Sequence, residues 1–178
     1  MNTLVLPAPL WRRLVAALYD GLLLLALWMI AALADVLIRD QLLGLSRDWG
    51  ALQAFYFLVG FFFFGWFWTH GGQTLGMRAW RLHLRRQDGA AIRWPIAGLR
   101  YAVMMISWGV LLTPLVLLLP IYSDHPNAFE IHLGAILASG IGLLSILTDA
   151  RKRAPCDRFS ATEVVVLPKG VEASDPVA

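Results

Sequence analysis

Four long apolar segments dominate the chain, at about residues 14–38, 51–69, 101–123 and 131–148. Each is close to the roughly 20 residues that a helix needs to cross a bilayer. Only 15% of the residues are charged, whereas a soluble domain carries about a quarter. The pattern predicts an all-α membrane protein: a four-transmembrane-helix bundle in one domain over residues 1–167, followed by a disordered cytoplasmic tail at 168–178.

Basic residues are unevenly spread among the connections between these segments. Thirteen of the 15 Lys and Arg residues precede the first segment, lie between the second and third, or follow the fourth. The other two, Arg39 and Arg47, lie between the first and second. Because basic loops stay in the cytoplasm, both termini and the loop at 70–100 are predicted to be cytoplasmic. The positive charge then indicates contact with the lipid bilayer and its anionic phospholipids, and no nucleic-acid binding.

The loop at 70–100 contains a regular alternation of apolar and polar residues. It runs from Trp80 to Arg85 with a period of two, which predicts a strand with one apolar face. Asp88-Gly89 is a turn signal, after which Ala90–Arg93 is predicted to return as a second strand. Glu163–Leu167 is a further candidate strand. Together they predict a small cytoplasmic β-hairpin/strand element.

The polar face of this element is basic. Its candidates for contact with lipid head groups are Arg81, Arg85 and Arg86. Such side chains are attracted to the negative surface of the cytoplasmic leaflet. The alternative is a solvated loop in which the alternation has no structural meaning.

One acid, Asp20, lies within the first apolar segment. If the hydrocarbon begins near Leu14, a rise of about 1.5 Å per residue places Asp20 about 9 Å deep. A charge there costs about 2.5–3.5 kcal/mol, so the carboxylate needs a basic partner, a proton or a bound cation. Arg13, two turns earlier on the same face, and Arg100 are the candidate partners, and Asp157 lies on the same predicted side. Two interpretations stay open: a buried ion pair, or a protonatable or cation-binding site.

Motifs for catalysis or cofactor binding do not occur in the sequence. The stretch from Gly71 to Gly76 lacks the Lys-Ser/Thr pair of a phosphate loop, and its glycines are interpreted as a tight exit from the second apolar segment. Cys156 is the single cysteine, and the four histidines have no spacing of metal or haem ligands. We therefore expect no enzyme, no metal site and no cofactor.

Three stretches taken together resemble a known family. They are Arg13-Leu14-x-Ala16-x-x-x-Asp20, then Gly72-Gln73-Thr74-Leu75-Gly76-Met77 with the later Asp88-Gly89 and Arg100, and Asp157-Arg158-x-x-Ala161-Thr162-x-Val164. In their order and spacing they resemble the RDD family of bacterial integral membrane proteins. The resemblance implies that Arg13 is the family arginine and Asp20 its first aspartate, with Asp157 as the second and Asp88 as the alternative.

Two positions depart from the family pattern. Cys156-Asp157 stands where members usually have His-Asp, and Met77 stands where they tend to have Lys or Arg. Both departures weaken any role carried over to these positions.

Some members of the family have been proposed as sodium/proton antiporters. The resemblance therefore implies a multi-pass bacterial inner-membrane protein that takes part in cation/proton-coupled transport, with Asp20 as the exchangeable carboxylate and monovalent cations or protons as its ligands. Four helices are few for a complete pathway, so this hypothesis also predicts a homo-oligomer. The alternative is a non-catalytic accessory or lipid-interacting membrane protein in which the Arg and Asp residues are structural.

Overall fold

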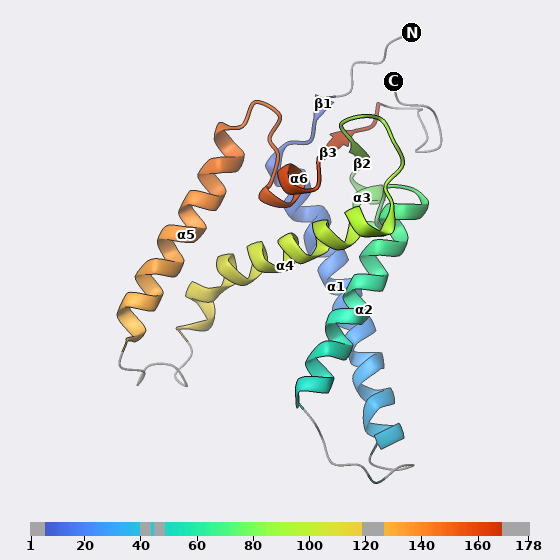
Figure 1. Cartoon of the computed structure of the whole chain (residues 1–178), viewed down its shortest axis with the longest axis vertical. Helices are drawn as coiled ribbons and strands as arrows, with labels where there is room; N and C mark the ends of the chain where they lie inside the picture. The colour runs from blue at the N-terminus through green and yellow to red at the C-terminus, as the bar shows by residue number, and fades with distance from the viewer. Residues whose placement is uncertain (1–5, 40–43, 45–48, 119–126, 169–178) are drawn as a thin grey trace. The chain divides into compact units, whose positions relative to one another are not determined.

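The computed structural model describes residues 6–39, 44, 49–118 and 127–168 (Figure 1). They form four long helices, α1 (Leu10–Val36), α2 (Trp49–His70), α4 (Trp94–Val116) and α5 (Ala128–Thr148). Between and after these lie two short helices, α3 (Leu75–Ala79) and α6 (Pro155–Phe159). The strands are β1 (Leu6–Pro7), β2 (Leu82–Arg86) and β3 (Thr162–Val166). The predicted disordered tail lies, apart from its first residue, outside the described residues.

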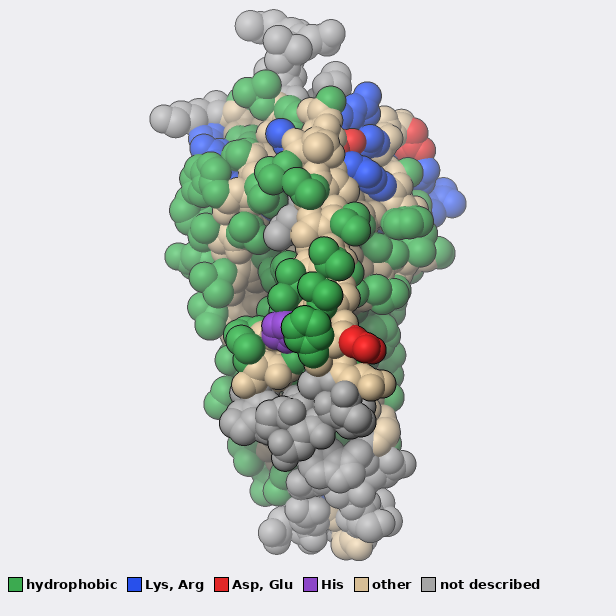
Figure 2. Space-filling view, turned by 90° about the vertical axis from the view of Figure 1, so that its left-hand side faces the viewer, with side chains coloured by type: hydrophobic (Ala, Val, Ile, Leu, Met, Phe, Trp, Pro, Cys, Tyr) green, Lys and Arg blue, Asp and Glu red, His purple; other side chains and the backbone are tan. Residues whose placement is uncertain are grey.

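The long helices expose apolar side chains along most of their length. Leu22 in α1 is 59% exposed, Phe62 in α2 58% and Ile141 in α5 68%. Figure 2 shows hydrophobic side chains along α5, the helix turned towards the viewer. Apolar surface this continuous is rare on soluble proteins and suits contact with lipid. Each of these helices is long and apolar enough to cross a membrane, which confirms the predicted fold class.

The third long helix begins earlier in the chain than the third apolar segment. Helix α4 starts at Trp94 instead of Tyr101, with Arg93 as its extended N-cap residue and Pro95 in its first turn. Proline fits there because the first N–H groups of a helix have no partner within the helix. The earlier start places Arg100 inside α4, where it is buried.

The chain divides into two units. The first comprises Met1–Leu84 with Val165–Ala178, and the second comprises Arg85–Val164. In the first unit α1 packs against both α2 and α3. The indole N–H of Trp28 in α1 donates to the carbonyl of Tyr56 in α2 at 3.1 Å.

The second unit has a similar internal arrangement. Helix α4 packs against α5 and α6. The hydroxyl of Ser139 in α5 donates to the carbonyl of Val110 in α4 at 3.0 Å. In each unit, therefore, the first long helix contacts both the second long helix and the short helix that follows it.

The β-element forms in two of its three predicted segments. Strand β2 has the alternation expected from the sequence, since Leu82 and Leu84 are buried and the residues between and after them are less so. Strand β3 forms within the candidate segment Glu163–Leu167, with Thr162 added at its start. The two belong to a three-stranded sheet with the order β1-β3-β2. Strand β1 pairs antiparallel with β3, and Pro7 suits this edge position because it has no N–H to donate.

The predicted return strand at Ala90–Arg93 is wrong. The turn before it forms as expected, with Gly89 at φ +74° and the Asp88 carboxylate accepting the N–H of Ala90 at 3.1 Å. The chain after the turn instead leads directly into the N-cap of α4 at Arg93. The neighbour of β2 in the sheet is instead β3, a strand rich in β-branched residues, which favour strands.

Candidate functional site

Asp20 is buried where α1 contacts α3, with 4% of the residue exposed. Its carboxylate accepts a hydrogen bond from the Thr74 hydroxyl at 2.5 Å and another from the Gly76 N–H at 2.8 Å. Both donors are uncharged. Within the first unit the Asp20 carboxylate therefore bonds neutral donors instead of Arg13, whereas a pairing with Arg100, which belongs to the second unit, stays a prediction.

Two features explain why Asp20 bonds neutral donors instead of Arg13: the distance between them and the short helix α3 that follows α2. Arg13 is seven residues away from Asp20 in α1, about 10 Å along the axis. The N-terminus of α3 lies against Asp20 and presents N–H groups that no helical carbonyl satisfies. An acid on α1 thus has donors close by without an arginine. Arg13 itself is half-buried in the first turn of α1.

Thr74 is the N-cap residue of α3. Its hydroxyl accepts the N–H of Met77 at 3.2 Å while donating to Asp20, so one side chain both caps α3 and joins it to α1. A threonine cap is worth about 1 kcal/mol by itself. Sequence reasoning missed this role, although a threonine directly before a helix-forming stretch is the ordinary N-cap signal.

Gly76 allows α3 to approach α1 closely. A Cβ added there would fall on the Ala16 carbonyl oxygen and lie 2.9 Å from the Asp20 carboxyl carbon. Gly72, at φ +63°, makes the tight exit from α2 that the sequence predicted. The glycines of this stretch therefore have two different purposes, a turn and a close approach.

The second unit buries a different charge constellation. Arg100 Nη1 donates to Asp157 Oδ1 at 2.5 Å, and the two side chains are 7% and 0% exposed. Asp157 is the third residue of α6, and its other oxygen accepts the N–H of Ala154, the N-cap residue, at 2.8 Å. The carboxylate thus caps α6 and neutralises a guanidinium at the same time. Losing either member would leave an uncompensated buried charge.

A series of hydrogen bonds between hydroxyl groups begins at the guanidinium of this ion pair. Arg100 also donates to the Thr162 hydroxyl at 2.7 Å. Because that oxygen accepts from arginine, its proton is available for Ser160, 2.8 Å away. Ser160 in turn donates to the Cys156 carbonyl at 2.6 Å. The guanidinium orders this chain of hydroxyls, of which the sequence analysis named Thr162 only as part of the family motif and did not name Ser160.

Asp157 and Asp88, the two candidates for the second family aspartate, lie in different environments. Asp157 is fully buried and paired, whereas the Asp88 side chain is 54% exposed in the turn after β2 and bonds Arg86 at 2.5 Å. Asp157 therefore has the constrained environment expected of a signature residue.

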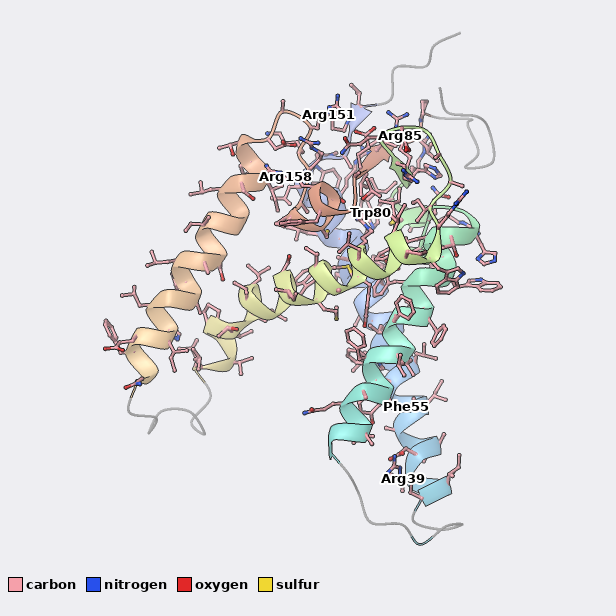
Figure 3. The ribbon with its side chains drawn as sticks, in the orientation of Figure 1. Arg39, Phe55, Trp80, Arg85, Arg151 and Arg158 are labelled. Atoms are coloured by element: carbon pink, nitrogen blue, oxygen red, sulfur yellow. The ribbon has the colours of Figure 1, made fainter. Side chains whose placement is uncertain are left out.

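The candidate head-group residues are partly engaged with acids. Arg85 pairs with Glu163 at 2.8 Å, and Arg86 with Asp88. Arg81 lies in the link before β2 at φ +58°. In Figure 3, Arg85, Arg151 and Arg158 lie at the same end of the second unit.

A further acid at this end lies at a helix C-terminus, where the sequence indicates compensation by the basic residues 151–153. Asp149, directly after α5, accepts from Arg153 Nε and Nη2 at 3.1 Å each, and Arg158 lies 3.5 Å away. The hydrogen bonds from the Arg153 side chain and backbone hold the pKa of Asp149 well below its usual range. Asp149 is therefore a fixed negative charge that compensates the surrounding arginines.

These features define a class of protein: a multi-pass integral membrane protein with buried polar residues on two of its long helices. The family model for the RDD family matches residues 7–161, most of the chain, and the protein belongs to that family. This confirms the resemblance found in the sequence. A search of curated proteins found no match, and neither did a search of solved structures.

Proposed function

We propose that the protein takes part in cation/proton-coupled transport, with Asp20 as the carboxylate that binds a proton or a monovalent cation. A single observation carries the proposal. Asp20 is 4% exposed within an apolar helix, and among the described residues both of its hydrogen-bond donors are uncharged. Two neutral donors orient a carboxylate without neutralising it, so a proton or cation is still needed to balance the charge.

The chemistry of the donors fits exchange better than permanent pairing. A hydroxyl such as that of Thr74 can donate to an ionised carboxylate or accept from a protonated one. It can also turn its oxygen towards a hard monovalent cation held by the carboxylate. A guanidinium can do none of these, because it is a donor only and always charged. The neutral donors of the first unit therefore suit Asp20 whether its carboxylate is ionised, protonated or bound to a cation.

The second candidate is a non-catalytic accessory or lipid-interacting protein in which Asp20 is structural. The same two hydrogen bonds favour it, because they join α1 to α3 across the first unit. Hydrogen bonds to a charged group are worth about 1.5–3 kcal/mol each. In either case we propose no covalent catalysis.

Replacing Asp20 by Asn separates the two candidates. Asp35→Asn is the matched control, an acid on the same helix that pairs with Arg39 at 2.7 Å. Folded yield in detergent and sodium-dependent proton flux in proteoliposomes would be measured for both variants. Transport at Asp20 predicts normal yield with flux abolished in Asp20→Asn alone. Collapsed yield would support the structural role, and wild-type flux in Asp20→Asn would remove the transport role.

We further propose that the protein lies in a bacterial inner membrane with the arginine-rich ends of both units in the cytoplasm, against anionic phospholipids. In this orientation Arg81, Arg85 and Arg86 are close to head groups. In a Cys156→Ala background, Arg151→Cys and Asn127→Cys place thiols after and before α5. A membrane-impermeant thiol reagent on intact cells should label Asn127→Cys only. Labelling of Arg151→Cys instead would contradict the proposed orientation.

A further inference from the structure

The short helix and strand that follow each pair of long helices match in length and in their positions along the chain. Helix α3 begins at Leu75 and α6 at Pro155, each has five residues, and each is followed by two linking residues and a five-residue strand. An offset of 80 residues therefore brings α3 onto α6 and β2 onto β3.

The backbone conformation obeys the same offset. The N-cap residues Thr74 and Ala154 have φ/ψ of −76°/171° and −72°/163°. The second linking residue is left-handed in both, at φ +58° for Arg81 and +50° for Ala161, although neither is glycine. Positive φ is uncommon outside glycine, so its recurrence at matching positions is a specific likeness.

Backbone hydrogen bonds follow the offset as well. The N–H of Leu167 donates to the carbonyl of Arg81, and the N–H of Gln87 donates to the carbonyl of Ala161. Exchanging the two copies, by adding 80 to Arg81 and subtracting 80 from Leu167, turns the first bond into the second. The first long helices of the two copies end in register, α1 at Val36 and α4 at Val116, although their starts at Leu10 and Trp94 do not differ by 80.

We propose that the chain contains two copies of one α-α-α-β motif, α1-α2-α3-β2 and α4-α5-α6-β3, and that Arg100 occupies in the second copy the position of Asp20 in the first. The offset places residue 20 on residue 100. Both are buried, and each bonds the short helix of its own copy: Asp20 at Thr74 and Gly76, Arg100 at Asp157.

The two copies differ in where the acid lies. In the first copy it is on the long helix, and Met77 occupies the third position of α3. In the second copy the acid is at that third position, Asp157, and the long helix supplies the guanidinium. The second copy thus contains its own cation. This consequence rests on the proposed function: the Asp20 site is the one that an exchangeable proton or cation would complete.

The register can be tested by rebuilding the second copy's ion pair in the first. Asp20→Arg alone leaves a buried guanidinium without an acid and should reduce folded yield several-fold. Adding Met77→Asp places a carboxylate where the second copy has Asp157, within reach of the new arginine and of the Thr74 N–H. The double variant should therefore recover most of the wild-type yield and melting temperature.

The matched control places the acid out of register on the same short helix. Leu75→Asp, at an exposed first-turn position, gives the same net charge and the same favourable helix-end electrostatics. Combined with Asp20→Arg it should give no recovery. Recovery equal to that of Met77→Asp, or no recovery with Met77→Asp, would overturn the register.

A reverse transplant keeps the test decisive if the first variants fold poorly. Arg100→Asp with Asp157→Met, Ala154→Thr and Cys156→Gly copies the Asp20 arrangement into the second copy. Its folded yield should exceed that of Arg100→Asp alone, and an equal or lower yield would count against the equivalence. Absence of proton flux in wild-type protein would remove the proposed function, but the folded yields that test the equivalence of the two copies would not depend on it.

Discussion

The Asp20 region of the first unit and the Arg100 region of the second unit bury charge in different ways. In the first, the donors to the Asp20 carboxylate among the described residues are both neutral. In the second, a guanidinium and a carboxylate neutralise each other inside a set of ordered hydroxyls. The local backbone is nearly the same in both. The comparison teaches that this helix–link–strand motif leaves the charge state open, so the side chains decide whether a site is permanently balanced or exchangeable.

The largest effect is expected from breaking the balanced site. Arg100→Met leaves Asp157 buried without its guanidinium and should lower the free energy of unfolding by about 3–5 kcal/mol. Adding Asp157→Leu removes the orphaned charge and should recover much of the loss. Melting in detergent measures both. If Arg100→Met were as stable as wild type, the Arg100–Asp157 ion pair would not be a source of stability in the second unit.

A smaller loss is expected from Gly76→Ala in the first unit. The added Cβ collides with backbone and with the Asp20 carboxyl carbon, so α3 must move away from α1 at a cost of about 1–3 kcal/mol. Gly21→Ala is the control, next to Asp20 and with nothing within 4 Å of the added carbon. It should stabilise α1 by up to about 1 kcal/mol. Similar melting temperatures for the two variants would contradict the close approach at Gly76.

Thr74→Val tests the neutral donor itself. It removes the cap of α3 and one hydrogen bond to Asp20, for an expected loss of about 1–2 kcal/mol. Thr74→Ser should keep both interactions and stay near wild type. Equal losses in the two variants would attribute the effect to packing and not to the hydroxyl.

The smallest effect is expected from Asp149, the acid that follows α5 in the second unit. Because the pKa of Asp149 is depressed in the folded protein, its contribution is fully present above the ordinary value of 3.8 and is lost as the pH falls towards the lower folded pKa. The melting temperature of wild-type protein should therefore fall below about pH 4 more steeply than that of Asp149→Asn. Parallel curves would show that Arg153 does not stabilise the carboxylate.

Much of the fold could be predicted because its signals are local. Hydrophobic length identified the four long helices, and alternation with a period of two identified β2. The prediction of a strand at Ala90–Arg93 was wrong because the neighbour of β2 is β3, about 80 residues away in the chain. A local sequence pattern does not show which distant segment pairs with a strand.

The sites divide in the same way. Burial of Asp20 could be inferred from the apolar residues around it, whereas its partners Thr74 and Gly76 lie more than 50 residues further along. Electrostatic reasoning favoured arginine and overlooked the N–H groups at the start of a five-residue helix. The repeat is hidden because few side chains agree between the copies, so only backbone conformation carries it.

The central claim is that Asp20 exchanges a proton or cation while Asp157 does not. An infrared titration of purified protein, following the carbonyl stretch of protonated carboxyl groups across pH with and without sodium, tests it most directly. We expect a sodium-sensitive titrating band in wild-type protein and in Asp35→Asn that is missing from Asp20→Asn. The same band in Asp20→Asn would contradict the account.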